Sequence, residues 1–284
     1  MPDSAEAPEH FDLGGSALAL RRHGTGQPAV VFISGRGDSS RVWDAVVDRL
    51  QVSATAITYD RPGCGESADL PTTVVPAPRP SSWSAGQLAD LLTVAGVTGP
   101  LVLVGHSLGG QIADAFATRL PDRVAGLVLV DSVDPELNLE TEPPHPVIDD
   151  AEDSRPGRGW QWDVAGSARE FRETQPSTLP PTVVVASAIW RWFRAKRPEW
   201  YRPFTLVEVD QRWQRAQLHY ANRWHGALVV AHDAGHRVHE EAPVLVAAAV
   251  DAVVAATKSG TALRLDEDLL RCLGGSVRPT SGAG

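Results

Sequence analysis

The sequence predicts an α/β fold in which a mostly parallel central β-sheet is flanked by helices. Two observations indicate this class. Short, nearly continuous apolar runs recur along the chain, as expected for strands that are buried on both faces of a sheet. Helical patterns separate these runs from residue 28 onward, so that parallel strands are joined by crossover helices. The chain has 284 residues, of which 43% are hydrophobic, and is therefore long enough to bury a large core.

The first part of the chain is expected to supply a hairpin, two buried strands and a helix. A β-hairpin is predicted over residues 11–22 because a pair of glycines lies inside it. The apolar runs at 28–34 and 54–60 predict strands. Between them, the segment 41–50 carries its apolar residues at helical spacing.

Strands and helices continue to alternate up to residue 257, which we take as the end of the main domain. The predicted elements are helices at 83–95, 111–118, 206–222 and 240–256, and strands at 101–104, 126–131, 182–187 and 227–231. Residues 258–284 are expected to form a poorly ordered C-terminal tail with one helical turn around 266–273.

Two segments are expected to form a lid rather than part of the core. Residues 133–181 are rich in proline and acidic residues and include a short helix at 163–174, and residues 190–204 are aromatic and basic. Five tryptophans gather there: Trp160, Trp162, Trp190, Trp192 and Trp200. They either line an apolar acyl pocket or only pack the lid on the core. The interleaved basic residues likewise fit either an anionic substrate or a solvated helix face.

The strand–turn–helix pattern around residues 101–118 carries the motif G-x-S-x-G. A strand that turns abruptly into a helix exposes Ser107 at its tip in a strained conformation. Gly105 and Gly109 leave room for the bend. The backbone N–H of Leu108, at the start of the helix, points to the place where an oxyanion would form. Ser107 is therefore the predicted nucleophile.

The composition argues against several classes of partner. A net charge of −9 and a pI of about 5.5 disfavour a nucleic-acid ligand. Cys64 and Cys272 form no metal-binding pattern, so neither a metal nor a cofactor is predicted. The N-terminus lacks the apolar core of a signal peptide, and no run reaches the length of a membrane span. A cytoplasmic protein that does not bind a membrane is therefore expected.

Three stretches together resemble the α/β-hydrolase fold superfamily. The first is the motif around Ser107. The second is the turn Asp60-Arg61-Pro62-Gly63-Cys64-Gly65-Glu66-Ser67, and the third is Asp233-Ala234-Gly235-His236, which with Glu240 and Pro243 is similar to the family's G-H…E-x-P ending. The resemblance covers about residues 11–257 and implies that His236 is the catalytic base.

The position of His236 agrees with that role, because it follows a strand and precedes a helix. A residue there lies at the carboxyl edge of the sheet, where Ser107 is also expected. His239 is the competing base, although it is expected to pack or cap near the last helix. His106 and His232 each end a strand and have packing explanations.

The resemblance also implies a second oxyanion donor in the loop after the first central strand. The family usually has His-Gly-x there, whereas this chain has Ser34-Gly35-Arg36. By position the donor is the backbone N–H of Arg36. A backbone donor does not depend on its own side chain, so Ser34 does not remove the function. The Arg36 side chain either reaches toward the substrate or faces solvent.

The catalytic acid is the point where the chain departs from the common pattern. Many relatives carry the acid beyond the strand that is here 182–187, but no carboxylate follows that strand until Glu199. Another branch, which includes some haloalkane dehalogenases, carries it at the end of the preceding strand, where this chain has Asp131. A carboxylate there accepts the Nδ1 proton of His236. Asp131 is therefore the predicted acid, and Asp134 is the alternative.

These residues and the resemblance predict a serine hydrolase that cleaves an ester, lactone or thioester of a small molecule through an acyl-enzyme on Ser107. A serine at this position excludes the aspartate chemistry of haloalkane dehalogenases and epoxide hydrolases of the same fold. Fold alone does not choose further. An acyltransferase, a cofactor-free haloperoxidase-like enzyme and a non-catalytic ligand-binding protein remain as alternatives, and no oligomeric state is predicted.

Overall fold

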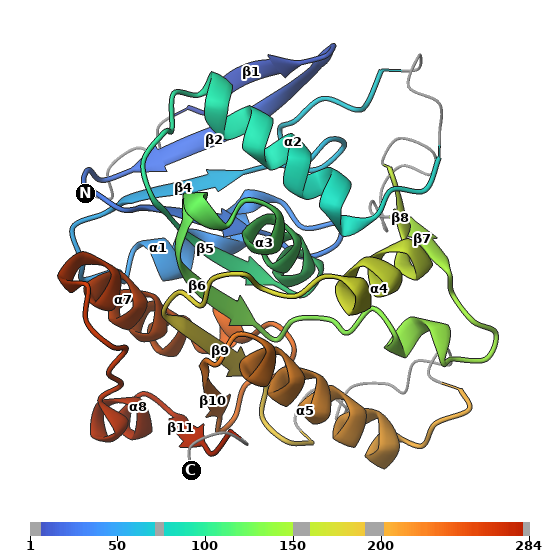
Figure 1. Cartoon of the computed structure of the whole chain (residues 1–284), viewed down its shortest axis with the longest axis vertical. Helices are drawn as coiled ribbons and strands as arrows, with labels where there is room; N and C mark the ends of the chain where they lie inside the picture. The colour runs from blue at the N-terminus through green and yellow to red at the C-terminus, as the bar shows by residue number, and fades with distance from the viewer. Residues whose placement is uncertain (1–6, 72–76, 150–159, 191–201, 281–284) are drawn as a thin grey trace.

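One large β-sheet crosses the centre of the molecule (Figure 1). The computed structural model describes residues 7–71, 77–149, 160–190 and 202–280. In chain order, the strands of this sheet are β1 (Glu9–Leu13), β2 (Ser16–His23), β3 (Ala29–Ile33), β4 (Thr55–Tyr59), β5 (Leu101–His106), β6 (Val124–Val130), β9 (Thr182–Ala186), β10 (Ala227–Ala231) and β11 (Gly275–Arg278). Within the described residues they form a nine-stranded sheet, ordered β1-β2-β4-β3-β5-β6-β9-β10-β11.

The sheet is parallel through its centre. Every neighbouring pair from β4 through β3, β5, β6 and β9 to β10 is parallel. The hairpin β1–β2 joins β4 in antiparallel fashion at one edge, and β11 joins β10 in antiparallel fashion at the other. The predicted α/β class with a mostly parallel sheet is therefore confirmed.

Helices cover both faces of this sheet. They are η1 (Ser40–Trp43), α1 (Asp44–Val47), α2 (Ser81–Val94), α3 (Leu108–Arg119), η2 (Pro121–Arg123), η3 (Leu137–Leu139), α4 (Val164–Glu173), α5 (Leu206–Arg223), α6 (Val238–Glu241), α7 (Pro243–Ser259) and α8 (Glu267–Cys272). A separate small hairpin consists of β7 (Val147–Asp149) and β8 (Gln161–Asp163).

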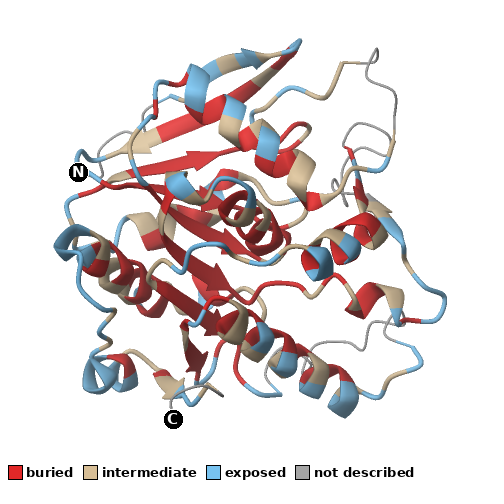
Figure 2. Cartoon of the chain, viewed as in Figure 1, coloured by how far each residue is buried: buried red, intermediate tan, exposed pale blue. Residues whose placement is uncertain are grey.

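The alternation of side chains along the strands creates two cores. Val31 and Leu103 point to the face that α2, α3 and α5 cover. Their chain neighbours Val30 and Val102 point to the opposite face, where α1 and α7 pack. All four are fully buried, and the central strands are buried along nearly their whole length (Figure 2). A strand buried on both faces reads as a continuous apolar run, which is the pattern seen in the sequence.

Two predicted helices are each divided in the structure. The segment 41–50 forms the 3₁₀ turn η1 followed by the short helix α1. The segment 240–256 forms α6 and then α7, which begins at Pro243. Proline lacks a backbone N–H and has a fixed φ, so it is suited to the first position of a new helix.

The expectation of a poorly ordered C-terminal tail is wrong for residues 258–280. The predicted helical turn is present as α8, but the chain then adds β11 to the sheet, paired with β10 from Leu228 to Ala231. Leu270 of α8 is buried in the core beside α7. The sequence of β11 is short and polar, so its pairing depends on the free edge of β10 rather than on an apolar pattern of its own.

The two segments predicted to form a lid are described only in part. Residues 133–181 contribute η3, the β7–β8 hairpin and α4, which lie at the side of the molecule farthest from α7 (Figure 1). Trp160 is buried against Trp83, and Trp190 is largely exposed. The predicted pocket residues Trp192 and Trp200, and the basic residues among them, lie outside the described residues.

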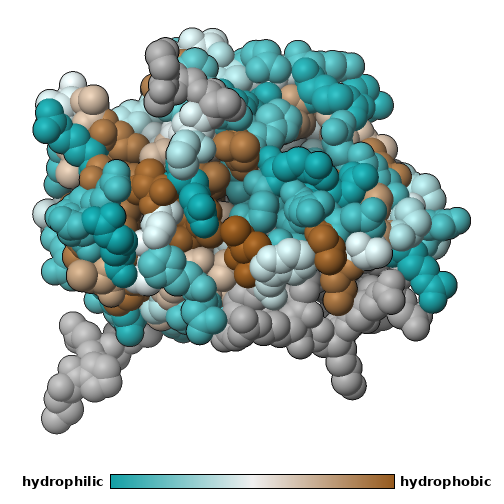
Figure 3. Space-filling model, turned by 90° about the horizontal axis from the view of Figure 1, so that it is seen from below, coloured by the Kyte–Doolittle hydropathy of each residue, from teal (hydrophilic) through white to brown (hydrophobic). Residues whose placement is uncertain are grey.

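The outer surface is mixed in character. On the face seen in Figure 3, apolar side chains form separate groups between hydrophilic ones. Among the described residues, none of the helices combines the length and apolar character needed to cross a membrane.

Candidate active site

The turn from β5 into α3 places Ser107 in a strained backbone conformation. Its φ is 54° and its ψ is −119°, a combination of backbone angles that residues other than glycine rarely adopt. A Cβ on Gly105 would lie 2.3 Å from the carbonyl oxygen of Gly109, and a Cβ on Gly109 would lie 2.1 Å from that of Ile33. Both glycines are therefore required by close backbone packing, as the motif predicts.

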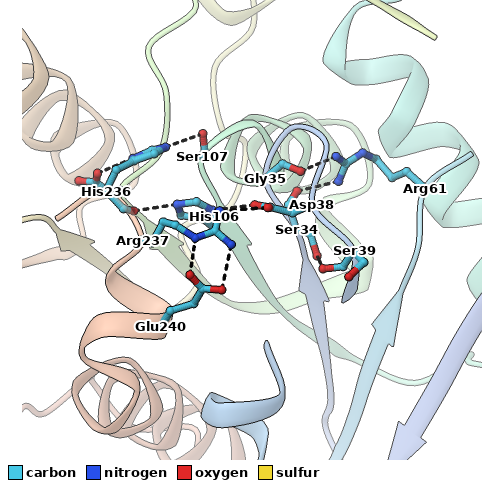
Figure 4. A network of polar contacts seen from close by, with 11 residues as sticks. Ser34, Gly35, Asp38, Ser39, Arg61, His106, Ser107, His236, Arg237 and Glu240 are labelled. Carbon is cyan, nitrogen blue, oxygen red and sulfur yellow. Dashed lines mark hydrogen bonds and ion pairs between the residues drawn. The ribbon is translucent and has the colours of Figure 1, made fainter. Parts of the chain in front are cut away.

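Three predicted side chains meet at the carboxyl edge of the sheet. His236 Nε2 lies 3.1 Å from Ser107 Oγ (Figure 4). His236 Nδ1 lies 2.8 Å from Asp131 Oδ2. With Nδ1–H donating to the carboxylate, Nε2 is left to accept the serine proton. The arrangement is that of a nucleophile, a base and an orienting acid.

Asp131 is held firmly in this arrangement. It directly follows β6, has a φ of 44° and is fully buried. Its Oδ1 accepts a hydrogen bond from the backbone N–H of Ser187 at 2.8 Å, which leaves Oδ2 for His236. The donor, Ser187, is the residue directly after β9, the strand beyond which many relatives were expected to carry the acid.

The alternative acid, Asp134, lies elsewhere. Its Oδ1 accepts a hydrogen bond from the backbone N–H of Glu136, and it lines a separate surface hollow with Arg212 and His219. Burial raises the pKa of the Asp134 carboxyl. The structure therefore brings Asp131, and not Asp134, to His236.

Two of the three competing histidines, His239 and His106, occupy packing positions, as expected, whereas His232 is exposed. His239 is fully buried with its ring against Trp43 and His106, at centroid distances of 4.7 and 4.1 Å. Burial lowers the pKa of His239 to about 3. His106 is also buried, which lowers its pKa well below the usual value, and its Nε2 donates to the backbone carbonyl of His236 at 2.8 Å. His232 contacts the hydroxyl of Ser276 at the sheet edge.

The two predicted oxyanion donors line the same cavity as Ser107. Leu108 is the first residue of α3, where backbone N–H groups have no partner within the helix. Arg36 lies in the loop of residues 34–39 that follows β3. A Cβ on Gly35 would lie 2.8 Å from Nδ1 of His106, so only glycine allows this loop to approach the strand end so closely.

The cavity over Ser107 has a volume of about 480 Å³. The sheet edge contributes most of the polar part of its wall, and the predicted lid contributes most of the apolar part together with two polar side chains. The residues from the lid segment are Val133, Leu137, Asn138, His145, Ile148 and Trp162. A cavity of this size, lined by both apolar and polar side chains, suits a small organic molecule. Within the described ranges, no group of three or more His, Cys, Asp or Glu side chains is placed to hold a metal ion.

Two features of the site were missed by the sequence analysis. Trp213 of α5 lines the cavity and packs edge-on against His236, with ring centroids 5.1 Å apart. The position of Trp213 in an amphipathic helix indicates that its side chain is buried, but it does not indicate which residue the side chain contacts. Arg237, the residue after His236, pairs with Asp38 of the 34–39 loop and with Glu240 (Figure 4). The opposite charges were visible in the sequence, but their proximity across 199 positions was not.

Sequence comparison identifies the family. The model described as the alpha/beta hydrolase family matches residues 30–249, which is most of the chain. An esterase of Mycobacterium tuberculosis is 33% identical over 135 residues, which are 48% of this chain and 43% of that protein. The 2-(acetamidomethylene)succinate hydrolase of Mesorhizobium japonicum is 33% identical over 130 residues, or 44% of each chain. The matches thus span less than half the length of these curated relatives.

Structural comparison gives the same fold. An esterase from Thermogutta terrifontis, solved with malate bound, superposes with a TM-score of 0.53 at 22% identity, covering 95% of this chain and 98% of the other. At that identity the likeness concerns the fold alone. The family match over residues 30–249 and the agreement in fold show that this chain belongs to the alpha/beta hydrolase family.

Proposed function

We propose that this protein is a serine hydrolase that cleaves small carboxylic esters through an acyl-enzyme on Ser107. The observation that carries the proposal is the continuous contact from Asp131 through His236 to Ser107, at 2.8 and 3.1 Å. The esterase among the relatives is consistent with it. The elbow serine, rather than an aspartate, favours acyl transfer over alkyl transfer.

The first half of the reaction forms the acyl-enzyme. Ser107 Oγ attacks the ester carbonyl carbon while His236 Nε2 takes the hydroxyl proton. The carbonyl oxygen becomes an oxyanion, which accepts hydrogen bonds from the backbone N–H groups of Arg36 and Leu108. His236 then gives its proton to the leaving alcohol as the carbon–oxygen bond breaks. Asp131 stabilises the imidazolium that forms in between.

The second half returns the enzyme to its starting state. Water attacks the acyl carbon, and His236 accepts one of its protons. Collapse of the second tetrahedral intermediate breaks the bond to Ser107 Oγ, which regains its proton from His236. The products are a carboxylic acid and the alcohol released earlier. The partly exposed ring of His236, 29% accessible, faces the cavity and therefore has access to this water.

Covalent labelling tests the nucleophile. We expect a fluorophosphonate probe to add one phosphonyl group to the wild-type protein, detected by intact-protein mass spectrometry, and to leave Ser107→Ala unlabelled. Ser84→Ala is a matched control, because Ser84 is a buried serine of α2 away from the cavity. Persistent labelling of Ser107→Ala at wild-type rate would reject the assignment of the nucleophile.

A panel of p-nitrophenyl esters, with and without acceptor alcohols, tests the reaction. Hydrolysis at a rate independent of added alcohol supports the proposal. Formation of a new ester in preference to the acid would instead indicate an acyltransferase. Absence of turnover with every ester, together with tight ligand binding and no labelling, would indicate a binding protein.

A further inference from the structure

The side chain of Arg61 binds the backbone of the 34–39 loop. Arg61 lies in the turn after β4, the strand next to β3, and its side chain is only 3% exposed. Its Nη1 donates to the backbone carbonyl of Ser34 and its Nη2 to that of Gly35, both at 2.6 Å (Figure 4). Hydrogen bonds from a charged donor are about twice as strong as neutral ones. One guanidinium group therefore fixes two successive carbonyl groups of the loop.

The second of these carbonyl groups belongs to the same peptide unit as the proposed oxyanion donor. The peptide bond between Gly35 and Arg36 is trans, so the Gly35 C=O and the Arg36 N–H lie in one plane and point in opposite directions. The guanidinium binds the carbonyl end of this unit. The N–H end is thereby turned away from Arg61, and Arg36 lines the cavity that contains Ser107.

The neighbouring residue fixes the far end of the same loop. Asp60 Oδ1 accepts a hydrogen bond from the backbone N–H of Ser40 at 2.5 Å, and Oδ2 accepts one from that of Glu66 at 2.9 Å. Asp60 and Arg61 are consecutive, and both are buried. The loop is therefore anchored at its start by a cation and at its end by an anion, and neither side chain lines the cavity.

We propose that Arg61 is a positioning residue of the oxyanion hole, acting through the Gly35–Arg36 peptide group. This inference rests on the function proposed above. The guanidinium sets the direction of the Arg36 N–H and, by drawing electron density from the Gly35 carbonyl, strengthens the N–H as a donor. Both effects stabilise the substrate most when its oxygen, which accepts the hydrogen bond from the Arg36 N–H, carries a full negative charge.

A purely structural role predicts a different outcome from a positioning role. Loss of a buried hydrogen-bonded arginine lowers stability in either case. Only a positioning role weakens binding of the transition state more than binding of the ester substrate. The discriminating measurements are therefore kcat against KM, and the affinity for a boronic acid, which adds to a catalytic serine as a tetrahedral anion.

The experiment compares Arg61→Met, Arg61→Lys and a control. Arg123→Met is the matched control, because Arg123 also donates to a backbone carbonyl, that of Val97 at 2.8 Å, but lies away from the cavity. The full-length variants are assayed with p-nitrophenyl acetate, with phenylboronic acid as inhibitor, and by thermal melting. Fluorophosphonate labelling of the wild-type protein is recorded in parallel.

For Arg61→Met we expect kcat to fall by about 10- to 100-fold with KM changed less than about threefold, since loss of a whole oxyanion donor costs about 10²–10³. The affinity for phenylboronic acid should fall in step with kcat/KM. Arg123→Met should melt at a lower temperature with unchanged kcat. An Arg61→Met protein whose kcat and boronate affinity match those of Arg123→Met would overturn the proposal.

Arg61→Lys keeps the proposal testable if the methionine variant does not fold. Lysine retains the charge but cannot hold two carbonyl groups with one planar fork, so we expect about a 3- to 10-fold loss of boronate affinity. Unchanged boronate affinity in this variant would also contradict a positioning role. Failure of the wild-type protein to bind the boronate or the fluorophosphonate contradicts the proposed function itself, which separates the two outcomes.

Discussion

Three imidazole rings lie together at the site, and their surroundings give them different properties. His236 contacts a carboxylate and a serine hydroxyl and reaches the cavity. His106 and His239 are buried behind it, and burial lowers the pKa of both, so they remain neutral near pH 7. Neutral rings next to the base avoid repulsion with the imidazolium that His236 forms during the proposed reaction.

The first prediction at this scale concerns the acid. Asp131→Asn should lower kcat by about 10³- to 10⁴-fold, because an amide does not stabilise the imidazolium and favours the wrong tautomer of His236. The asparagine Oδ1 still accepts the hydrogen bond from Ser187, so the melting temperature should change little. Asp134→Asn is the matched control and should keep kcat within about threefold. A loss in the control but not in Asp131→Asn would move the acid to Asp134.

The second prediction concerns the stability of the protein in acid. In the unfolded chain His239 binds a proton below about pH 6.5, whereas in the folded chain it does so only below about 3. The unfolded state therefore binds more protons between these values, and stability falls as the pH drops through this window. By pH 5 the loss amounts to about 2 kcal/mol relative to neutral pH.

His239→Phe should remove this contribution, since a phenyl ring has no titratable group and fits between two other rings. The check is the free energy of unfolding from urea titrations at pH 7 and pH 5. His10→Phe, at an exposed position, is the control and should keep the wild-type difference. An equal difference between the two pH values in His239→Phe and wild type would contradict the assignment.

At the scale of elements, one edge of the sheet, the strand β11, differs most from what the sequence predicts. Central strands are recognisable because burial on both faces demands a continuous apolar run. The edge strand β11 has the sequence Gly-Ser-Val-Arg, which carries no such pattern. Its structure depends on backbone pairing with β10, whose residues lie more than 40 positions earlier in the chain.

A pair of adjacent leucines tests the contribution of α8. Leu270 is 3% exposed and packs in the core with α7, while Leu269 is 48% exposed. Leu270→Ala should lower the free energy of unfolding by about 2–4 kcal/mol, because it removes buried apolar surface and leaves a cavity. Leu269→Ala should change it by less than about 0.5 kcal/mol. Equal effects in urea titrations would mean that α8 does not dock as described.

At the scale of the whole molecule, the site is assembled from four loops at one edge of the sheet. The loops follow β3, β5, β6 and β10, and they supply Arg36, Ser107, Asp131 and His236. Parallel strands bring their carboxyl ends to the same edge, which is why residues 200 positions apart meet. The segment after β6 then covers this edge and forms the apolar wall of the cavity.

The cavity between the sheet edge and the segment after β6 is expected to limit the length of the acyl chain that can bind. Ile148 of β7 lines this cavity and is only half-buried, so it is replaceable at small cost. We expect Ile148→Ala to shift the optimal acyl chain of p-nitrophenyl esters toward longer chains, and Ile148→Trp to shift it toward shorter ones, each by about 10-fold in relative kcat/KM. Identical chain-length profiles for both variants would place the acyl group elsewhere.

The sequence by itself determined the central strands and the elbow serine now proposed as nucleophile, and its resemblance to the family indicated the residues now proposed as base and acid. Apolar periodicity, glycine spacing and the order of strands are local properties, and together they also fix which loops share an edge. Only the tertiary structure decided that Asp131 rather than Asp134 faces His236, that Trp213 packs on the base, and that Arg61 binds the loop carrying Arg36. These contacts join segments distant in the chain, and their directions depend on how side chains pack, which no local pattern encodes.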